Sequence, residues 1–307
     1  MRALEKVFLG TIARESLLPA GSHITAAVSG GADSVAMLYL LCRFADARDW
    51  HVDVLHINHR LRAASDEDES FVRNLAGQLD VPARFVSPEP DTKGSMESRW
   101  SSIRQSIYME QPGIVAVAHT ASDRAETILM RLFEGAGLRG LGGMDYHGVE
   151  PVQRPILDMH STEIRNWLKE KGHHWVEDFS NRDMVMSRNR LRLEVMPALE
   201  EQFPEAVSGI CRSGALLSHW RDLQDQLSGL TGGDSVSREE LLEVPGVLGA
   251  LMLWQMAGKP RNGFDEFQKI LDWIRRGGRG KHILPGGKRL VAEDELVRVE
   301  SGGPGRF

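Results

Sequence analysis

The chain has 307 residues, of which 41% are hydrophobic and 26% are charged, and its formal net charge is −6. This length allows two domains with cores of their own, and an acidic chain offers nucleic acid a binding site only as a local basic patch. The two cysteines, Cys42 and Cys211, stand far apart. This argues against a disulfide framework or a zinc cluster and favours the reducing cytoplasm.

Neither an export signal nor a membrane span is expected. Residues 1–6 mix charged with apolar residues and predict the start of an amphipathic helix rather than a signal peptide. No apolar run approaches the roughly 20 residues that a membrane-spanning helix needs. We therefore expect a cytoplasmic protein without a membrane partner.

Short apolar runs alternate with helix-like segments through the first half of the chain. Alternation of this kind predicts a parallel sheet with helices on both faces, and ligands then bind at the carboxyl ends of the strands. We expect strands at 24–28, 52–57, 83–86 and 114–118, and helices at about 33–47, 66–80, 95–109 and 123–134.

The pattern becomes mainly helical after about residue 150. Ser161 is a candidate N-cap for a helix that ends at Gly172, and Ser237 with Glu240 has the capping-box spacing. Helices are expected at 162–171, 184–201 and 205–228, and two strands within 281–299. We predict an α/β catalytic domain over 1–204, with a helical extension from about 150. A smaller, mainly helical domain over 205–307 is expected to end in a β-hairpin.

A glycine-rich loop follows the first expected strand and reads Ser29-Gly30-Gly31-Ala32-Asp33-Ser34. A turn of this kind exposes backbone N–H groups at the positive end of a helix, which is a ready anion site. The glycines permit a positive φ and remove Cβ atoms that would block a phosphate. The loop lacks the Walker A frame. It therefore predicts nucleotide binding by another type of loop, with a plain strand-to-helix turn as the alternative.

Polar residues also follow two other expected strands. His56, Asn58 and His59 end the second strand, and His119 ends the fourth. Their spacing matches no zinc frame, so contact with a nucleotide or substrate is favoured.

Two carboxylates, Asp123 and Glu126, lie near the start of the next helix. They either satisfy the helix dipole or hold Mg²⁺ against nucleotide phosphates.

A G-x-G-x-x-G match at residues 135–140 follows a helix rather than a strand, which excludes a dinucleotide fingerprint. A loop beside the site, with Arg139 contacting an anionic substrate, fits better, and a simple glycine linker is the alternative.

Two segments are rich in basic residues. Four arginines between 182 and 192 indicate either a phosphate-binding patch or a salt-bridged helix start. A second cluster, between Arg275 and Arg289, suits an RNA backbone or is an ordinary basic surface loop.

Taken together, these segments resemble the tRNA(Ile)-lysidine synthase family of the PP-loop (N-type ATP pyrophosphatase) superfamily. The matching stretches follow the family's order over about 28–200, and five together are highly specific. The last third resembles the family's small tRNA-binding domain loosely, and the chain is expected to end without the further C-terminal domain of longer members. The stretches are 28–34, 56–67, 118–127 with 135–144, 154–157 and 177–192.

The resemblance implies a ligase that uses ATP and Mg²⁺. The wobble cytidine in the CAU anticodon of tRNA(Ile) is adenylated, and free L-lysine then attacks through its ε-amine and displaces AMP, which forms lysidine. Pyrophosphate leaves toward Gly30 and Gly31. A homodimer is one assembly that we expect as an option.

The site residues that the resemblance implies fall into three groups. The catalytic group is Asp33, which also orients Mg²⁺, with Asp123 and Glu126. ATP is bound by Ser29, Gly30, Gly31, Ala32, Asp33, Ser34, His56 and His119. The tRNA or another substrate is bound by Arg99, Arg139, Glu177, Asp178, Asn181, Arg188, Asn189 and Arg190.

Some positions depart from the family pattern. Ser122 stands where an acid is usual, Arg124 replaces a Gln, and Ser161 replaces an arginine. In the helix at 98–104, Arg99 matches, whereas the second arginine is shifted to Arg104. The ATP half of the site is therefore better supported than the tRNA and lysine half.

Three other functions share parts of this pattern. A tRNA 2-thiolation enzyme on the same loop would need cysteines for sulfur transfer or for an iron–sulfur cluster, and the two isolated cysteines argue against it. An amidotransferase-type synthetase would lack the arginine-rich segments. A catalytically degraded tRNA-binding module would keep the loop only as structure.

Overall fold

The computed structural model describes residues 3–58, 65–88, 96–177, 187–229, 233–258, 260, 264–284 and 287–300. Contacts divide the chain into two compact units, residues 1–218 and 219–307. The expected boundary at residue 204 lies upstream of this division, because α10 (Ala206–Gly229) begins within the first unit. There Cys211 Sγ donates to Ala121 O and Ser218 Oγ donates to Gly142 O. None of the described helices is long and apolar enough to cross a membrane.

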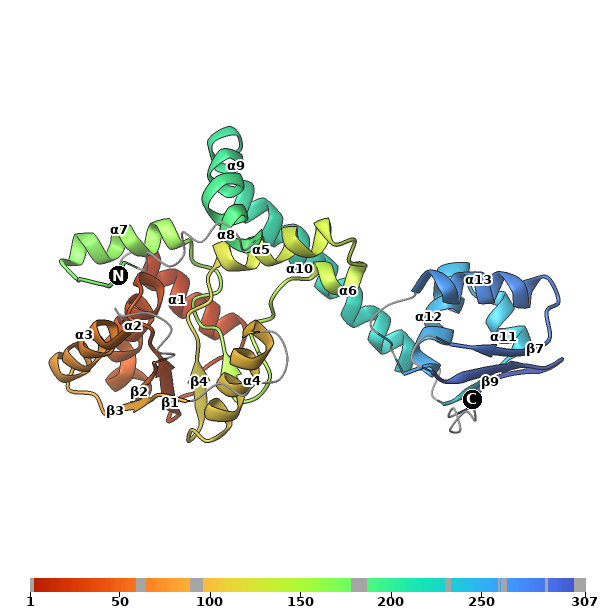
Figure 1. Cartoon of the computed structure of the whole chain (residues 1–307), viewed down its shortest axis with the longest axis horizontal. Helices are drawn as coiled ribbons and strands as arrows, with labels where there is room; N and C mark the ends of the chain where they lie inside the picture. Colours follow the sequence, from red (N-terminus) through yellow and green to blue (C-terminus); the bar gives the residue numbers. More distant parts are fainter. Residues whose placement is uncertain are drawn as a thin grey trace. The chain divides into compact units, whose positions relative to one another are not determined.

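The first unit is built on a parallel sheet of strand order β3-β2-β1-β4-β5 (Figure 1). The sequence predicted β1 (His23–Ala27), β2 (His51–Ile57), β3 (Ala83–Val86) and β4 (Ile114–Ala116), and the structure confirms them. It did not predict β5 (Val152–Gln153), because two residues close to prolines carry no periodicity of their own.

Helices cover both faces of this sheet. The main core lies between one face and helices on that side, and Phe8, Met37, Val72 and Trp167 are buried in it. On the other face, Tyr108 of α4 packs against residues of β4 and β5. The helices are α1 (Ala3–Arg14), α2 (Ala32–Arg48), α3 (Ser65–Gln78), α4 (Met96–Met109), α5 (Ala121–Phe133), α6 (Leu138–Leu141) and α7 (Ser161–Lys171).

The start of α7 corrects one expectation. His160 is the N-cap and Ser161 is the first helical residue, so the Ser161 side chain does not cap the helix. Gly172 ends the helix as predicted, in the left-handed conformation with φ 68°. The Ser161 hydroxyl is therefore available to other partners.

The expected helix at 184–201 is divided in the structure. It consists of α8 (Ser187–Arg190), a π-helical segment η2 (Leu191–Val195) and α9 (Met196–Gln202). A π-helical turn changes the direction in which side chains leave the helix, and such turns are frequent at functional sites.

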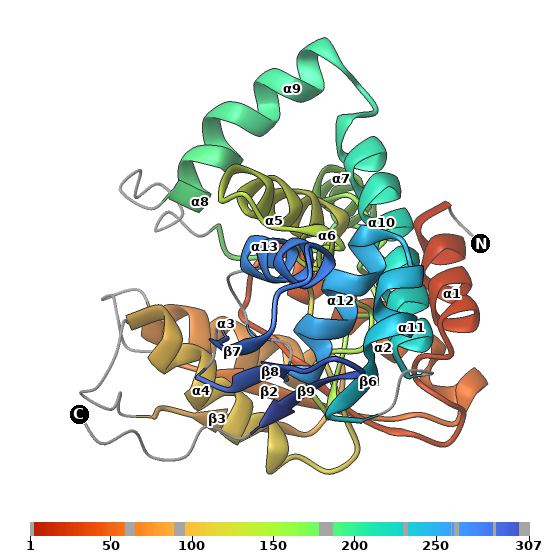
Figure 2. The same cartoon turned by 90° about the vertical axis from the view of Figure 1, so that its right-hand side faces the viewer.

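The second unit pairs helices with an antiparallel sheet of order β6-β9-β8-β7 (Figure 2). The expected hairpin is present as β7 (Gly280–Ile283) and β8 (Arg289–Ala292), but β9 (Leu296–Glu300) and β6 (Ser235–Ser237) extend it. The remaining elements are α11 (Arg238–Glu243), α12 (Gly246–Met256) and α13 (Phe264–Arg275). As predicted from the capping-box spacing, Ser237 Oγ accepts from Glu240 N at 3.0 Å.

Candidate functional site

The glycine-rich loop (residues 29–34) joins β1 to α2 at the carboxyl edge of the sheet. Gly30 has φ 98°, in the region that favours glycine. Its carbonyl accepts from Val176 N at 2.9 Å, which ties the loop to the chain that follows α7. Within the loop, Ser34 Oγ donates to Gly31 O at 2.9 Å and accepts from Ser29 N at 3.2 Å. These hydrogen bonds of Ser34 fix the conformation of the loop.

Gly31 is the N-cap of α2, and no side chain caps this end of the helix among the described residues. The first backbone N–H groups of a helix have no partner within the helix. The positive end of the helix dipole lies at the same place. The start of α2 can therefore bind an anion such as a phosphate.

Asp33 stands in the first turn of α2 with a largely buried carboxylate. Burial, together with the negative charge of Asp123, raises the pKa of Asp33 from 3.8 to about 6. Its Oδ2 lies 3.4 Å from Ser161 Oγ, whereas its buried Oδ1 has no hydrogen-bond partner among the described residues. A buried carboxylate oxygen without a donor is costly, so this atom is suited to a cation or a donor from a ligand.

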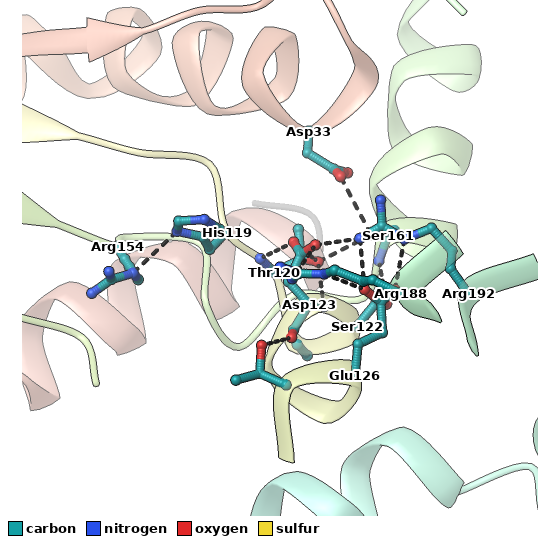
Figure 3. A network of polar contacts seen from close by, with 12 residues as sticks. Asp33, His119, Thr120, Ser122, Asp123, Glu126, Arg154, Ser161, Arg188 and Arg192 are labelled. Atoms are coloured by element: carbon teal, nitrogen blue, oxygen red, sulfur yellow. Dashed lines mark hydrogen bonds and ion pairs between the residues drawn. The ribbon is translucent and has the colours of Figure 1, made fainter. Parts of the chain in front are cut away.

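The first turn of α7 lies against the first turn of α5 (Figure 3). Ser161 Oγ is 3.1 Å from Thr120 Oγ1, and Ser161 N donates to Ser122 Oγ at 3.4 Å. Ser122 and Ser161 are two of the positions that depart from the family pattern. The structure brings these departures together, so two neutral residues replace an acid and an arginine at neighbouring places.

Asp123 forms a capping box with Thr120 at the start of α5. Its Oδ2 accepts from Thr120 N and from Thr120 Oγ1, both at 2.9 Å. Burial alone would raise the pKa of Asp123, but the Arg192 charge and the Thr120 hydrogen bonds outweigh it and lower the pKa. Asp123 is therefore ionised, and its Oδ2 is already used in capping the start of α5.

Glu126 is buried, with a side chain only 3% exposed, and two arginines neutralise it. Arg192 donates from Nε to Oε1 at 2.7 Å and from Nη2 to Oε2 at 2.9 Å. Arg188 Nε donates to Oε2 at 3.3 Å. Arg192 Nη2 also donates to Asp123 Oδ1 at 2.5 Å. Although burial acts against it, this pairing raises the pKa of Arg192.

Arg192 is a site residue that the sequence did not single out, and Arg154, described below, is another. Arg192 belongs to the predicted arginine-rich segment and stands four residues after Arg188, which is helical neighbour spacing. The side chain of Arg190, a predicted substrate-binding residue, is 64% exposed, and its Nε lies 3.8 Å from Oε2 of Glu194.

Two histidines occupy different positions at the edge of the sheet. Arg154 Nε donates to His119 Nδ1 at 3.1 Å. Burial, together with the charges of Arg154 and Arg188, lowers the pKa of His119 to about 4. His56 is buried, and its Nδ1 donates to Val28 O at 2.8 Å, which supports the strand just before the loop.

The remaining predicted residues are more dispersed. Arg124, another departure from the family pattern, is buried and donates to Tyr146 OH at 3.4 Å, which is a packing role. Arg99 lies on α4 and Asn189 on α8, both partly buried, and Glu177 is exposed. His59, Asp178, Asn181 and the side chain of Arg139 lie outside the described residues.

The described residues contain no cluster of three or more His, Cys, Asp or Glu side chains that could hold a metal. Cys42 on α2 and Cys211 on α10 are both free, and burial raises the pKa of each thiol to about 11. A thiol with such a pKa is a poor nucleophile. Neither of these two thiols is therefore activated as a thiolate near neutral pH.

Comparison with known proteins gives this site a family. The model of the PP-loop domain matches residues 8–199, which include the glycine-rich loop, the start of α5 and Arg192. Among solved structures, the U34-tRNA thiolase NcsA from Methanococcus maripaludis, which holds a [4Fe-4S] cluster, has a TM-score of 0.60 at 18% identity. That match covers 70% of this chain and 78% of the thiolase. At this identity it shows a shared fold.

Curated relatives are closer in sequence. The tRNA(Ile)-lysidine synthase of Azoarcus sp. (strain BH72) is 34% identical over 261 residues, which cover 80% of this chain and 58% of the relative. The tRNA(Ile)-lysidine synthase of Gloeobacter violaceus is 35% identical over 225 residues, which cover 69% of this chain and 67% of the relative. The tRNA(Ile)-lysidine synthase of Chlorobaculum tepidum is 36% identical, and the match covers 66% of this chain and 64% of the relative. The matches thus span between about half and two thirds of the curated relatives' length. The chain belongs to the tRNA(Ile)-lysidine synthase family of PP-loop proteins.

Proposed function

We propose that this chain ligates L-lysine to the wobble cytidine in the CAU anticodon of tRNA(Ile), at the expense of ATP. The observation that carries the proposal is the start of α2 at Gly31, which no described side chain caps, with the buried Asp33 beside it, in a chain of this family. A cytoplasmic location, and a homodimer as one assembly, belong to the same proposal.

The first step is adenylation of the cytidine. The O2 atom of the base attacks the α-phosphorus of ATP, the bond to the bridging oxygen of the β-phosphate breaks, and pyrophosphate leaves with the electron pair. The backbone N–H groups at the start of α2 stabilise the negative charge that develops there. The hydrogen bonds of Ser34 Oγ with Ser29 N and Gly31 O hold the loop in one conformation, which favours this contact.

Asp33 fits a Mg²⁺ ion, because its Oδ1 is buried without a partner among the described residues and Mg²⁺ prefers carboxylate and phosphate oxygens. Bound there, the ion would neutralise charge on the phosphates. Burial, with the charge of Asp123, raises the pKa of Asp33, and a bound cation would favour its ionised form.

In the second step the lysine ε-amine attacks C2 of the cytidine, the C2–O bond breaks and AMP leaves, while the amine loses a proton. Asp123 and Glu126 supply negative charge for an ammonium group. The lowered pKa of Asp123 suits it to hold a cation better than to accept a proton. Arg188 and Arg192 now occupy these carboxylates, so a lysine at this position has to exchange with a guanidinium.

The arginine-rich segment and the second basic cluster are the proposed tRNA contacts. In the second cluster, Arg275 donates to Val244 O and Arg279 pairs with Asp294 at 2.5 Å, so these two arginines already have protein partners. Arg289 and Lys281 lie at exposed positions, where side chains can reach phosphates.

The test is release of AMP and pyrophosphate from ATP with a CAU-anticodon tRNA(Ile) transcript, with and without L-lysine. We expect AMP only when tRNA and lysine are both present, and none with a tRNA(Met) transcript of the same anticodon. Binding of the tRNA without AMP release would support the alternative of a tRNA-binding module that has lost catalysis.

A further inference from the structure

His119 follows β4 (Ile114–Ala116), three residues beyond its carboxyl end, as the glycine-rich loop follows β1. The register of β1 with β4 pairs Ile24 with Ile114 and Ala26 with Ala116. Because the two strands are parallel neighbours, Ser29 after β1 and His119 after β4 both follow carboxyl ends at the same edge of the sheet. The ring therefore belongs to the carboxyl edge of the sheet, where nucleotides bind in folds of this kind.

Arg154 fixes the hydrogen-bonding state of this ring (Figure 3). Its Nε donates to His119 Nδ1 at 3.1 Å, and its Nη1 donates to Asp145 O at 2.8 Å, which anchors the guanidinium from its other end. A guanidinium has only donors, so Nδ1 must be the unprotonated acceptor. A neutral ring then carries its proton on Nε2.

The ring is also neutral at physiological pH. Burial and the charges of Arg154, Arg188 and Arg104 lower the pKa of His119 to about 4, although Asp123 acts in the opposite direction. His119 cannot then serve as a cation for phosphate. With Nδ1 occupied and Nε2 protonated, it cannot accept a proton as a general base either.

We propose that His119 binds the nucleotide as a neutral donor, through Nε2–H to an acceptor oxygen or nitrogen of ATP, and that Arg154 is the positioning residue that fixes this tautomer. The inference rests on the proposed use of ATP and assigns His119 one chemical role within it. It also gives Arg154, 35 residues away in sequence, a function in the site.

The first test needs neither tRNA nor lysine. In ¹⁵N-histidine-labelled protein, long-range ¹H–¹⁵N spectra identify which ring nitrogen carries the proton, and His119→Gln assigns the signal. We expect a single Nε2–H tautomer between pH 6 and 8. Arg154→Met should give a tautomer mixture, whereas Arg154→Lys, which keeps a donor, should restore the Nε2–H form. A protonated Nδ1 in the unsubstituted protein overturns the proposal.

The second test measures the Kd for ATP with Mg²⁺ in matched variants. The amide of His119→Gln reaches the place of Nε2, and that of His119→Asn reaches the place of Nδ1. We expect Gln to stay within about threefold of the unsubstituted protein and Asn to weaken binding about tenfold, the scale of one hydrogen bond. Equal losses in both, or a smaller loss in Asn, contradict the donor role.

A double variant separates positioning from packing. Arg154→Met alone should weaken ATP binding. Combined with His119→Gln, it should cause little further loss of ATP affinity, because an amide has no tautomer to fix. Additive losses would make Arg154 a packing residue and overturn its assigned role. If ATP binds as expected but no AMP forms with tRNA and lysine, the proposed ligase function fails while this inference stands.

Discussion

Arg192 forms a bidentate ion pair with Glu126, in which Nε donates to Oε1 at 2.7 Å and Nη2 donates to Oε2 at 2.9 Å. Bidentate pairs of this kind are the strong ones, because both donors are charged and the planar groups match in shape. The contact joins η2 to α5 across 66 residues of sequence. It therefore stabilises the fold around the site and also occupies a carboxylate that a substrate amine could use.

Arg192→Met should be destabilising, because it leaves a buried Glu126 carboxylate short of donors. Losing one partner of a buried pair costs about 3–5 kcal/mol, and we expect about 2–3 kcal/mol here, since Arg188 remains. Urea unfolding of Arg192→Met and of the double variant with Glu126→Gln measures this, and the double variant should recover most of the loss. No recovery would show that Arg192 acts through other contacts.

Asp33→Asn should remove AMP formation and still raise stability. The pKa of Asp33 is raised from 3.8 to about 6 in the folded protein, so the native state binds the proton more tightly. Stability then falls as pH rises through this window, by about 3 kcal/mol in total. Without nucleotide and Mg²⁺, the variant should be more stable than the unsubstituted protein at pH 8 and equal to it below pH 4. Full AMP formation in this variant would refute the assigned role.

The two loop glycines should respond differently to alanine. Gly30 has φ 98°, where a Cβ is strained, and we expect Gly30→Ala to cost about 1–2 kcal/mol. Gly31 has φ −71°, and a Cβ there meets only Ser29 Oγ, at 3.6 Å. Gly31→Ala should therefore fold normally but weaken ATP binding, because the methyl group stands at the anion site. Thermal unfolding and ATP titration of both variants decide this, and equal stability losses would contradict it.

Asp158 should contribute stability that depends on pH. It accepts from Thr11 Oγ1 at 2.7 Å, Tyr146 OH at 2.7 Å and Arg14 Nη2 at 2.5 Å. Burial alone would raise the pKa of Asp158, but these donors, Arg14 first, lower it.

Because the folded pKa lies below the unfolded one, the stabilisation is present above about pH 4 and is lost as pH falls through the folded pKa. Asp158→Asn should cost about 1–2 kcal/mol at pH 7 and progressively less at pH 3. Thr11→Val, which removes one donor, serves as the control and should cost less. A loss in Asp158→Asn that does not change with pH would contradict the assignment.

The strands β1 to β4 and the glycine-rich loop could be predicted because each carries a local signal: an apolar run, then glycine and a polar turn. The end of α7 at Gly172 was likewise local. The contacts between the site residues could not be predicted in this way, because they join distant parts of the sequence. The π-helical turn at η2 decides which arginine pairs with Glu126, and no periodicity in the sequence predicts this turn.

The same holds for Arg154 and His119. Their contact requires β5 to pair with β4, and β5 is only two residues long. Sequence identified both residues as members of motifs but could not join them, because the pairing of strands is decided by tertiary packing. Ser161 was expected to cap its own helix, whereas its hydroxyl instead approaches Asp33 and Thr120.

The most direct measurement is transfer of radiolabelled L-lysine to a tRNA(Ile) transcript with a CAU anticodon, in the presence of ATP and Mg²⁺. We predict that labelled tRNA and AMP form in equal amounts, that Asp33→Asn forms neither, and that tRNA(Met) stays unlabelled. Tight tRNA binding without any lysine transfer, under conditions where ATP also binds, would contradict the proposed ligase function.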